Sequence, residues 1–278
     1  MDAATKKELQ IIAQKVRIGI IDGVHSAKSG HPGGSLSCAD ILTYLFFKEM
    51  NVDPENPKMD SRDRFVLSKG HAAPALYSVL AHRGYFSVDL LKTLRKPESI
   101  LQGHPDMKYI PGVDMSSGSL GQGISAAVGM ALSAKHFGDD FKVYTVLGDG
   151  EAEEGQVWEA AMFAANKGLS NLTAFVDYNN LQIDGTIEEV NSAAPFDKKF
   201  EAFGWHTITI NGNDFDEIEK ALNEAKTVDK PVAIIAKTVK GKGVSYMENA
   251  VNWHGAAPND ELYSQAISEL NAKLDELI

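Results

Sequence analysis

The sequence predicts an α/β fold in which helices cover both faces of a parallel sheet. Short apolar runs at 64–68, 141–147, 172–178, 205–210 and 231–238 have the length and composition of buried strands. Segments with helical periodicity separate most of these runs. Strands that alternate with helices form parallel sheets, because a parallel strand pair needs a crossover connection.

The chain is expected to form one domain over residues 1–278. With 278 residues, 44% of them hydrophobic, and a mean hydropathy of -0.19, it can bury a full core. No repeat, low-complexity tract or linker rich in Pro, Gly or Ser divides it.

The amino-terminal half begins with a helix over 3–28, whose apolar positions recur at helical spacing and which ends before SGHPGG. A second helix is predicted at about 36–49. The run RFVLS at 64–68 predicts a strand, and HAAPALYSVLAHRG predicts a helix closed by Gly84. The irregular stretch 95–119 carries aromatic and apolar residues, which indicates an ordered functional loop.

The remaining elements follow in alternation. A helix is predicted from Leu120 to about Phe137. A βαβ unit follows, which consists of the strand FKVYTVL, a helix from about Glu151 and the strand LTAFVDY. Strand WHTITI, helix DFDEIEKALNEAKTV and strand PVAIIAKT continue the pattern, and an amphipathic helix occupies 260 to the end.

Charge and cysteine content exclude several classes of function. A formal charge of -11 and a pI of about 5.2 repel nucleic acids and anionic membranes, so any bound anion must be held locally. One cysteine, Cys38, excludes a disulfide framework and a thiolate-rich metal site, and suits a reducing compartment. The first residues, MDAATKKELQ, are not a signal peptide, so a cytoplasmic location is expected.

Polar residues follow two strands of the predicted βαβ unit. Gly148, Asp149 and Gly150 follow 141–147, and Asn179 follows 172–178. Ligands of parallel sheets bind beyond the carboxyl ends of strands, where a following helix offers its amino terminus to an anion. Carboxylate and amide oxygens suit Mg²⁺ or Ca²⁺, which predicts a metal diphosphate ligand. The alternative is a strand-to-helix turn with an Asp N-cap and an ordinary loop.

An Asp between glycines followed by the Asn179–Asn180 pair resembles the thiamine diphosphate fingerprint. SGHPGG (29–34), LSKGHA (67–72), GHPD to GISAAVGMA (103–131) and HGAAP (254–258) resemble, in order, the motifs of the diphosphate-binding half of transketolase. The likeness extends from about residue 5 to 260. Subunits similar to deoxyxylulose phosphate synthase, or to the α chain of 2-oxoacid dehydrogenases, are the alternatives within the same coenzyme class.

The resemblance implies a set of cofactor residues. The metal ligands would be Asp149, Asn179 and the main-chain carbonyl of Leu181. Near the thiamine diphosphate the resemblance places the residues His71, Gly118, Leu120, Gly148, Asp149, Gly150, Glu154 and Asn179. Glu154 would lie at a subunit interface between cofactors, or would be an ordinary acid in a first helical turn.

The resemblance also implies catalytic histidines. His31, His104 and His254 would face the sugar: His104 toward a terminal hydroxyl, and the other two toward the hydroxyl that loses its proton. Imidazole suits this task because its pKa lies near working pH. The remaining histidines, expected to be surface or capping residues, are His25, His82, His136 and His206. Lys240 and Lys242 form a basic loop near the diphosphate or a partner, or are solvated.

The resemblance covers half of an enzyme. The pyrimidine-binding and carboxy-terminal domains of the family are absent here, so we expect them on a separate chain, with two copies of each subunit in a heterotetramer. The implied activity is transfer of a two-carbon ketol unit from a ketose phosphate, such as xylulose 5-phosphate of the pentose phosphate pathway, to an aldose phosphate. A noncatalytic scaffold of the same fold remains an alternative. A nicotinamide dehydrogenase is disfavoured because no strand precedes a GxGxxG turn.

Overall fold

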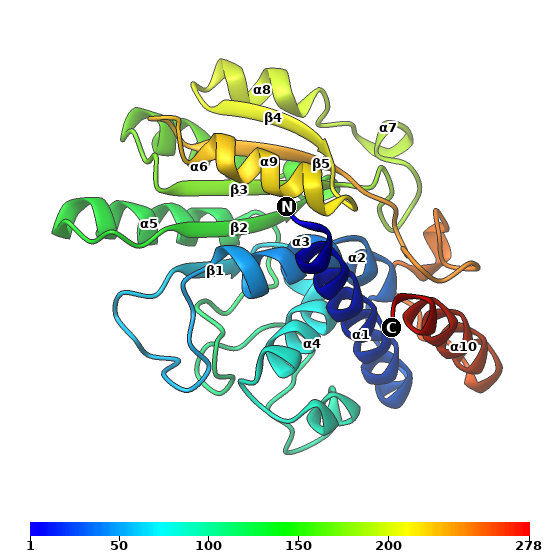
Figure 1. Cartoon of the computed structure of the whole chain (residues 1–278). Helices are drawn as coiled ribbons and strands as arrows, with labels where there is room; N and C mark the ends of the chain where they lie inside the picture. Colours follow the sequence, from blue (N-terminus) through cyan, green and yellow to red (C-terminus); the bar gives the residue numbers. More distant parts are fainter.

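The computed structural model describes residues 1–278 and contains a single five-stranded sheet (Figure 1). All neighbouring strands pair in parallel, in the order β1-β2-β3-β5-β4. The strands are β1 Arg64–Leu67, β2 Val143–Gly148, β3 Leu172–Tyr178, β4 His206–Asn211 and β5 Val232–Lys237. The predicted α/β class and parallel sheet are confirmed, and each predicted strand is present to within a few residues.

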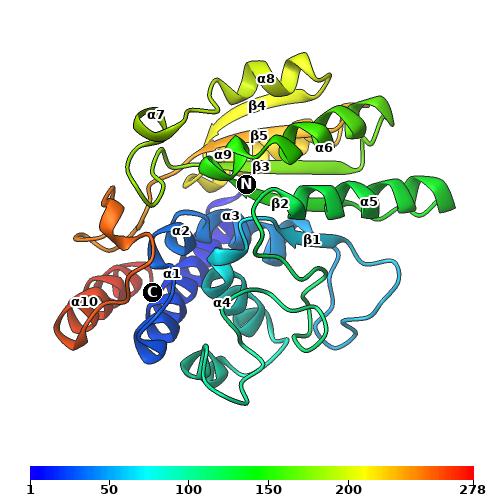
Figure 2. The ribbon, with the colours of Figure 1, turned by 180° about the vertical axis from the view of Figure 1, so that it is seen from behind.

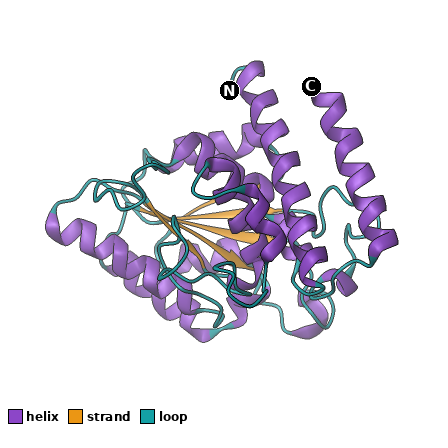
Figure 3. Cartoon of the chain, turned by 90° about the horizontal axis from the view of Figure 1, so that it is seen from below, coloured by secondary structure: helices purple, strands orange, loops and turns teal.

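Two separate apolar cores lie on the two faces of the sheet. The α-helices are α1 Ala3–Ala27, α2 Pro32–Ser37, α3 Ala39–Tyr44, α4 Ala73–Arg83, α5 Gln122–Phe137, α6 Gly155–Asn166, α7 Ile187–Val190, α8 Phe196–Ala202, α9 Phe215–Ala225 and α10 Asp260–Leu277. One core joins the sheet to α1, α3, α4 and α9, and the other joins it to α5, α6 and α8. Figures 1 and 2 show the two faces, and Figure 3 shows the strands between the helices.

Strand β5 explains why both faces need a cover. Val232, Ile234 and Ala236 belong to the first core, whereas Ala233 and Ile235 belong to the second. Side chains alternate between faces along a strand, so a continuous apolar run must be buried on both sides.

The helix predicted at 36–49 is wrong in its bounds and continuity. The chain becomes helical at Pro32, breaks at Cys38 and ends in a π-helical turn over Leu45–Glu49. The break follows from a competing hydrogen bond: the Gly34 carbonyl accepts from Lys69 Nζ at 2.6 Å, while the Cys38 amide donates to Leu36.

Two further helix starts differ from the prediction. The helix expected from Leu120 begins at Gln122, because Gly121 at its N-cap has a φ of 81°, which helical residues do not adopt. The helix expected from about Glu151 begins at Gly155, after a 3-10 turn over Gly150–Glu153. The segment 95–119 is irregular, as expected, and contains neither helix nor strand.

The two ends of the chain lie together. Helix α10 packs along α1 (Figure 3), and Lys7 Nζ donates to the carbonyl of Ile278 at 3.5 Å. Helices α7 and α8 occupy the connection from β3 to the edge strand β4. None of the helices combines the length and apolar character needed to span a lipid bilayer.

Candidate active site

A cavity of about 130 Å³ opens at the carboxyl ends of β2 and β3. Eight of the sequence-predicted site residues line it: His71, Leu120, Gly148, Asp149, Gly150, Asn179, Leu181 and His254. Its other lining residues are Gly34, Lys69, Glu151, Gln182, Ile183 and Lys240. The convergence of segments distant in sequence on one sheet edge follows from the parallel topology, because all strands end on the same side.

The turn after β2 is fixed by two carboxylates. Asp149 is buried and its oxygens accept from the amides of Gly150 at 2.9 Å and Asn180 at 2.6 Å. The second carboxylate, Glu151, accepts from the amides of Gly148 at 3.0 Å and Gly121 at 2.9 Å. It thereby ties the loop before α5 to the end of β2.

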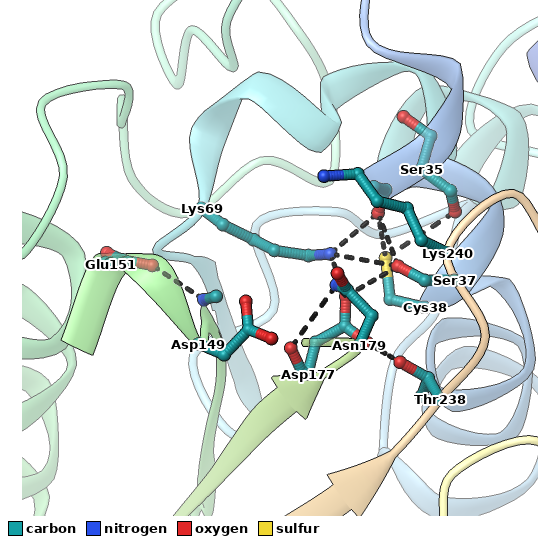
Figure 4. Close-up of polar contacts among 12 residues, drawn as sticks. Ser35, Ser37, Cys38, Lys69, Asp149, Glu151, Asp177, Asn179, Thr238 and Lys240 are labelled. Atoms are coloured by element: carbon teal, nitrogen blue, oxygen red, sulfur yellow. Dashed lines mark hydrogen bonds and ion pairs between the residues drawn. The ribbon is translucent and has the colours of Figure 1, made fainter. Parts of the chain in front are cut away.

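A buried ion pair crosses the floor of the cavity (Figure 4). Lys69 and Asp177 are 1% and 0% exposed and form a salt bridge. Asp177 also accepts from Ser37 Oγ at 2.6 Å, from Asn179 Nδ2 at 3.3 Å and from Thr238. Burial alone would lower the pKa of Lys69, but the Asp177 carboxylate raises this pKa above its ordinary value. The lysine is therefore a permanent cation.

The acid and amide of the predicted metal site lie at neighbouring strand ends. Burial and then the Asp177 charge raise the pKa of Asp149 to about 7, and no cation lies within ion-pair distance of Asp149. The Leu181 carbonyl accepts from Lys240 Nζ at 2.7 Å, so it already faces a positive charge. A hard cation would neutralise Asp149 and use these oxygens, so the donor set fits a divalent metal.

Three histidines form a cluster above the floor. The ring centroids of His31 and His71 are 5.3 Å apart, those of His31 and His254 are 5.6 Å apart, and those of His71 and His254 are 5.3 Å apart. Lys240 Nζ donates to His254 Nδ1 at 2.9 Å. His31 Nδ1 is buried and has no hydrogen-bond partner.

The cluster is uncharged at neutral pH. Burial and the Lys240 charge lower the pKa of His254 to about 3, and burial with the Arg95 charge lowers the pKa of His31 to about 4. Burial and the Lys69 charge hold the pKa of His71 well below its ordinary value. Neutral imidazoles keep one nitrogen free to accept a hydrogen bond, but the pKa values of His31 and His254 lie well below the near-neutral value expected from the sequence, so both rings are weak bases in this state.

His104 lies outside the cavity on the irregular loop. Its ring packs on Gly118, where a Cβ would come within 2.8 Å of His104 Cδ2. Gly118 in turn packs on Gly70, where a Cβ would come within 2.6 Å of the Gly118 nitrogen. The buried Tyr77 holds the other side of the loop, with its hydroxyl 2.8 Å from the His104 carbonyl. These close contacts bring His104 next to the segment that carries His71.

Some predicted residues lie apart from the cavity. Glu154 is exposed and forms the N-cap of α6 beside Gly121, and Lys242 is half-buried and pairs with Glu248 at 3.4 Å. The histidines expected to be structural also lie elsewhere: His25 pairs with Asp260, His206 with Glu224, and His82 with a main-chain carbonyl, while His136 lies in the last turn of α5.

Three buried charges of the site were not predicted from the sequence, and a fourth was left open. Lys69 follows the predicted strand 64–68, and Asp177 lies within the predicted strand 172–178. A charged residue in or beside a buried strand indicates a buried partner of opposite charge, because unpaired charges are rarely buried. This signal could have predicted the Lys69–Asp177 ion pair. Glu151 carried no such signal, because it stands in a run of acids. Lys240, for which solvation was an open alternative, is 1% exposed.

A larger hollow of about 810 Å³ lies at the opposite edge of the sheet. It is open and polar, and its arginines are engaged: Arg62 pairs with Asp114, and Arg64 donates to the Asp60 carbonyl at 2.9 Å. It contains no histidine and no glycine turn at a strand end, so we place the chemistry at the smaller cavity.

A parallel sheet whose carboxyl edge carries a glycine-flanked acid, an amide and a buried Lys69–Asp177 ion pair is the arrangement expected of a coenzyme-binding domain of the thiamine diphosphate class. The transketolase family, through its thiamine diphosphate binding domain, matches residues 8–274. The chain therefore belongs to the transketolase family, whose members are transferases that use thiamine diphosphate with a divalent metal. This confirms the predicted family and coenzyme over the other thiamine diphosphate enzymes considered above.

Similar proteins fall into two groups by length. The 6-deoxy-6-sulfo-D-fructose transketolase subunit SqwG of Clostridium sp. (strain MSTE9) is 46% identical over 264 residues, which are 95% of this chain and 96% of that protein. An apulose-4-phosphate transketolase subunit of Phocaeicola vulgatus is 43% identical, with 97% of this chain and 96% of that protein covered.

The second group consists of transketolases more than twice as long. Human transketolase is 41% identical over 98% of this chain but only 44% of its own length. The crystal structure of Campylobacter jejuni transketolase superposes with a TM-score of 0.90 at 35% identity, covering 100% of this chain and 46% of the other. This chain thus spans less than half of these enzymes.

Proposed function

We propose that this chain is the amino-terminal subunit of a split transketolase, active only with a separate carboxy-terminal subunit. Its coverage of two subunit-type relatives from end to end, and of less than half of human transketolase, supports this assignment. The observation that carries a catalytic role is the cluster of neutral histidines beside Asp149 and Asn179. A noncatalytic scaffold has no chemical use for such a cluster.

The residues around the cavity suit the diphosphate end of the coenzyme. Asp149, Asn179 and the Leu181 carbonyl would hold the divalent metal, preferentially Mg²⁺. Gly34 and Gly150 would let phosphate oxygens approach the main chain, and Lys240 offers a cation at the same wall. Bound thiamine diphosphate supplies a nucleophilic thiazolium carbon and an electron sink for the carbon–carbon bond that breaks.

The histidines have separate roles in this proposal. His31 and His254 assist the departure of the donor hydroxyl proton in different ways. His31, which is neutral and has an unpartnered Nδ1, offers a free nitrogen to this proton. His254 accepts from Lys240 at Nδ1, so its Nε2 carries the ring hydrogen and donates a hydrogen bond to the substrate oxygen. The charge of Lys240 beside His254 keeps this ring unprotonated before substrate arrives. His104 orients the terminal hydroxyl of the ketose from the irregular loop, and His71 contacts the coenzyme.

The assembly is proposed as a heterotetramer, in which the pyrimidine end of the coenzyme and the missing domains belong to the partner chains. Glu154, exposed at the start of α6, would lie at a subunit interface. The donor is a ketose with an anionic group: xylulose 5-phosphate of the pentose phosphate pathway, or a sugar of the kinds named for the two subunit-type relatives. The single cysteine, which is free and buried, suits the cytoplasm.

A ketol-transfer assay tests the proposal. The chain alone, its carboxy-terminal partner alone and the two mixed are supplied with thiamine diphosphate, Mg²⁺, each candidate donor and an aldose phosphate. We expect turnover only in the mixture, and none after Asp149→Ala. Full turnover by the chain alone would contradict the split enzyme, and a mixture that binds coenzyme without turnover would favour a scaffold.

A further inference from the structure

A further cavity, of about 220 Å³, lies between α1, α10, the start of α9 and the turn after β5 (Figure 1). It shares no residue with the cavity that carries Asp149. Four basic side chains line it, although the chain as a whole carries a charge of -11. They are Lys6 and Arg17 of α1, Lys242 of the turn after β5 and Lys273 of α10. The cavity is therefore a local concentration of positive charge on an acidic protein.

Arg17 is buried in the wall of this cavity and has one nitrogen unused. Its side chain is 4% exposed, its Nη2 donates to Asp40 at 2.6 Å, and its Nε donates to the Lys242 carbonyl at 3.2 Å. Nη1 donates to no protein acceptor. Gly243, with a φ of 96°, packs on this side chain, and a Cβ there would come within 3.1 Å of Arg17 Cδ. The guanidinium is thus held in place, and its free donors need an acceptor from a ligand or from water, because buried unpaired donors are costly.

The two carboxylates that line the cavity already have donors of their own. Asp40 accepts from Arg17 and, at 2.9 Å, from Asn213 Nδ2. Asp214 is the N-cap of α9 and accepts from two main-chain amides of its first turn at 2.8 and 3.1 Å. Neither carboxylate is directed at Nη1 of the guanidinium.

The lysines of the cavity can turn toward a ligand at little cost. Lys6 and Lys273 pair with the exposed carboxylates Asp216 and Glu276. Ion pairs at the surface contribute little to stability, because water solvates both charges when they separate. An anion that also meets the buried guanidinium can therefore draw these ammonium groups away from their surface partners.

We propose that this cavity binds a small phosphate-bearing anion, either inorganic phosphate or the phosphoryl group of a small metabolite. A phosphate presents its oxygens in a tetrahedron, which suits cations that converge from α1, α10 and the turn after β5, whereas a carboxylate presents its oxygens in one plane. Pockets for drug-sized ligands hold about 300–1,000 Å³, so a cavity of about 220 Å³ suits only a small ligand. The site goes beyond the proposed ketol transfer, because its lining contains no histidine and none of the residues proposed for the coenzyme.

Isothermal titration calorimetry of the full chain tests the site with inorganic phosphate, sn-glycerol 3-phosphate and malonate as probes. Glycerol 3-phosphate has no carbonyl group, so it cannot take part in ketol transfer. In Lys6→Gln/Lys273→Gln we expect the affinity for phosphate to fall roughly 10-fold or more, because two charge-assisted hydrogen bonds are lost. Arg17→Lys, which keeps the charge but not the fork of donors, should also weaken binding. Lys96→Gln/Lys230→Gln removes two exposed cations outside the cavity, so it is the control matched in net charge and should bind phosphate like the wild type.

The outcomes separate the sources of the ligand and the alternatives to it. Equal or tighter binding of inorganic phosphate identifies the free ion, and tighter binding of glycerol 3-phosphate identifies a phosphorylated metabolite; both support the site. No saturable binding of either phosphate would mean that water alone completes Arg17. Unchanged affinity in Lys6→Gln/Lys273→Gln would place the bound phosphate elsewhere, and an equal loss in both double variants would indicate a general effect of net charge. Tighter binding of malonate than of phosphate would assign the cavity to carboxylates. Each of these last four results overturns the inference, and circular dichroism of every variant distinguishes a lost site from a lost fold.

Discussion

Replacing Asp177 by Asn tests the buried ion pair under the cavity. The substitution keeps the shape of the side chain but removes the only carboxylate that pairs with Lys69. The ammonium, 1% exposed, is left with neutral acceptors such as the Gly34 carbonyl at 2.6 Å. Removing one partner of a fully buried pair costs about 3–5 kcal/mol, because the remaining charge stays desolvated. We expect a loss of free energy of unfolding of this size.

Urea denaturation followed by circular dichroism measures this loss at fixed protein concentration and pH 7. Asp229→Asn is the matched control, because Asp229 is exposed and makes no hydrogen bond or ion pair, and it should change the free energy of unfolding by less than about 0.5 kcal/mol. In the double variant Lys69→Met/Asp177→Asn the stranded charge is gone, so stability should recover in part. If Asp177→Asn is as mild as the control, or if the double variant is less stable than either single variant, the reasoning about the pair is refuted.

Three further predictions concern the same region. The folded-state pKa of His31, about 4, lies below its usual value of 6.5, so the stability that His31 contributes is complete above pH 6.5 and is lost as pH falls through 4. In His31→Asn the melting temperature should therefore depend less on pH between 6.5 and 4. Parallel curves of melting temperature against pH for the wild type and the variant would contradict this. Lys240→Met should raise the pKa of His254 from about 3, as followed by NMR titration of the ring. An unmoved pKa would mean that the Lys240 charge does not contribute to the shift. Gly70→Ala should lower the free energy of unfolding by about 1–3 kcal/mol, because the new Cβ would lie 2.6 Å from the Gly118 nitrogen. Gly129→Ala, the control in open space, should raise it by about 0.4–1 kcal/mol. Equal melting temperatures for the two variants would contradict the contact.

The sheet was predictable because four of its five strands are apolar on both faces, whereas the edge strand β4 is partly exposed. Runs such as 231–238 have no polar alternation, and this pattern is satisfied only when helices cover both sides. Helix boundaries were less predictable. The break at Cys38 depends on Lys69, which competes for the Gly34 carbonyl from a distant part of the chain. The residues around Cys38 do not by themselves predict this hydrogen bond, because its donor is 35 positions away from Gly34 in the sequence.

The site was predictable where it consists of strand ends, and less so where it depends on tertiary contacts. Asp149 and Asn179 follow adjacent parallel strands, and topology alone brings them together. The roles of Glu151 and Lys240 depend on which amides and carbonyls surround them in the folded chain. The resemblance to transketolases supplied the histidines, since their motifs are separated by long stretches of sequence.

The central claim is that this chain holds the metal and the diphosphate while a partner chain holds the pyrimidine. A crystal structure of the two-subunit complex with thiamine diphosphate and Mn²⁺ tests it most directly, because Mn²⁺ is located by its anomalous scattering. We predict an anomalous peak bonded to Asp149, Asn179 and the Leu181 carbonyl, with the pyrimidine ring on the partner chain. A peak elsewhere, or a coenzyme enclosed entirely by copies of this chain, would contradict the account.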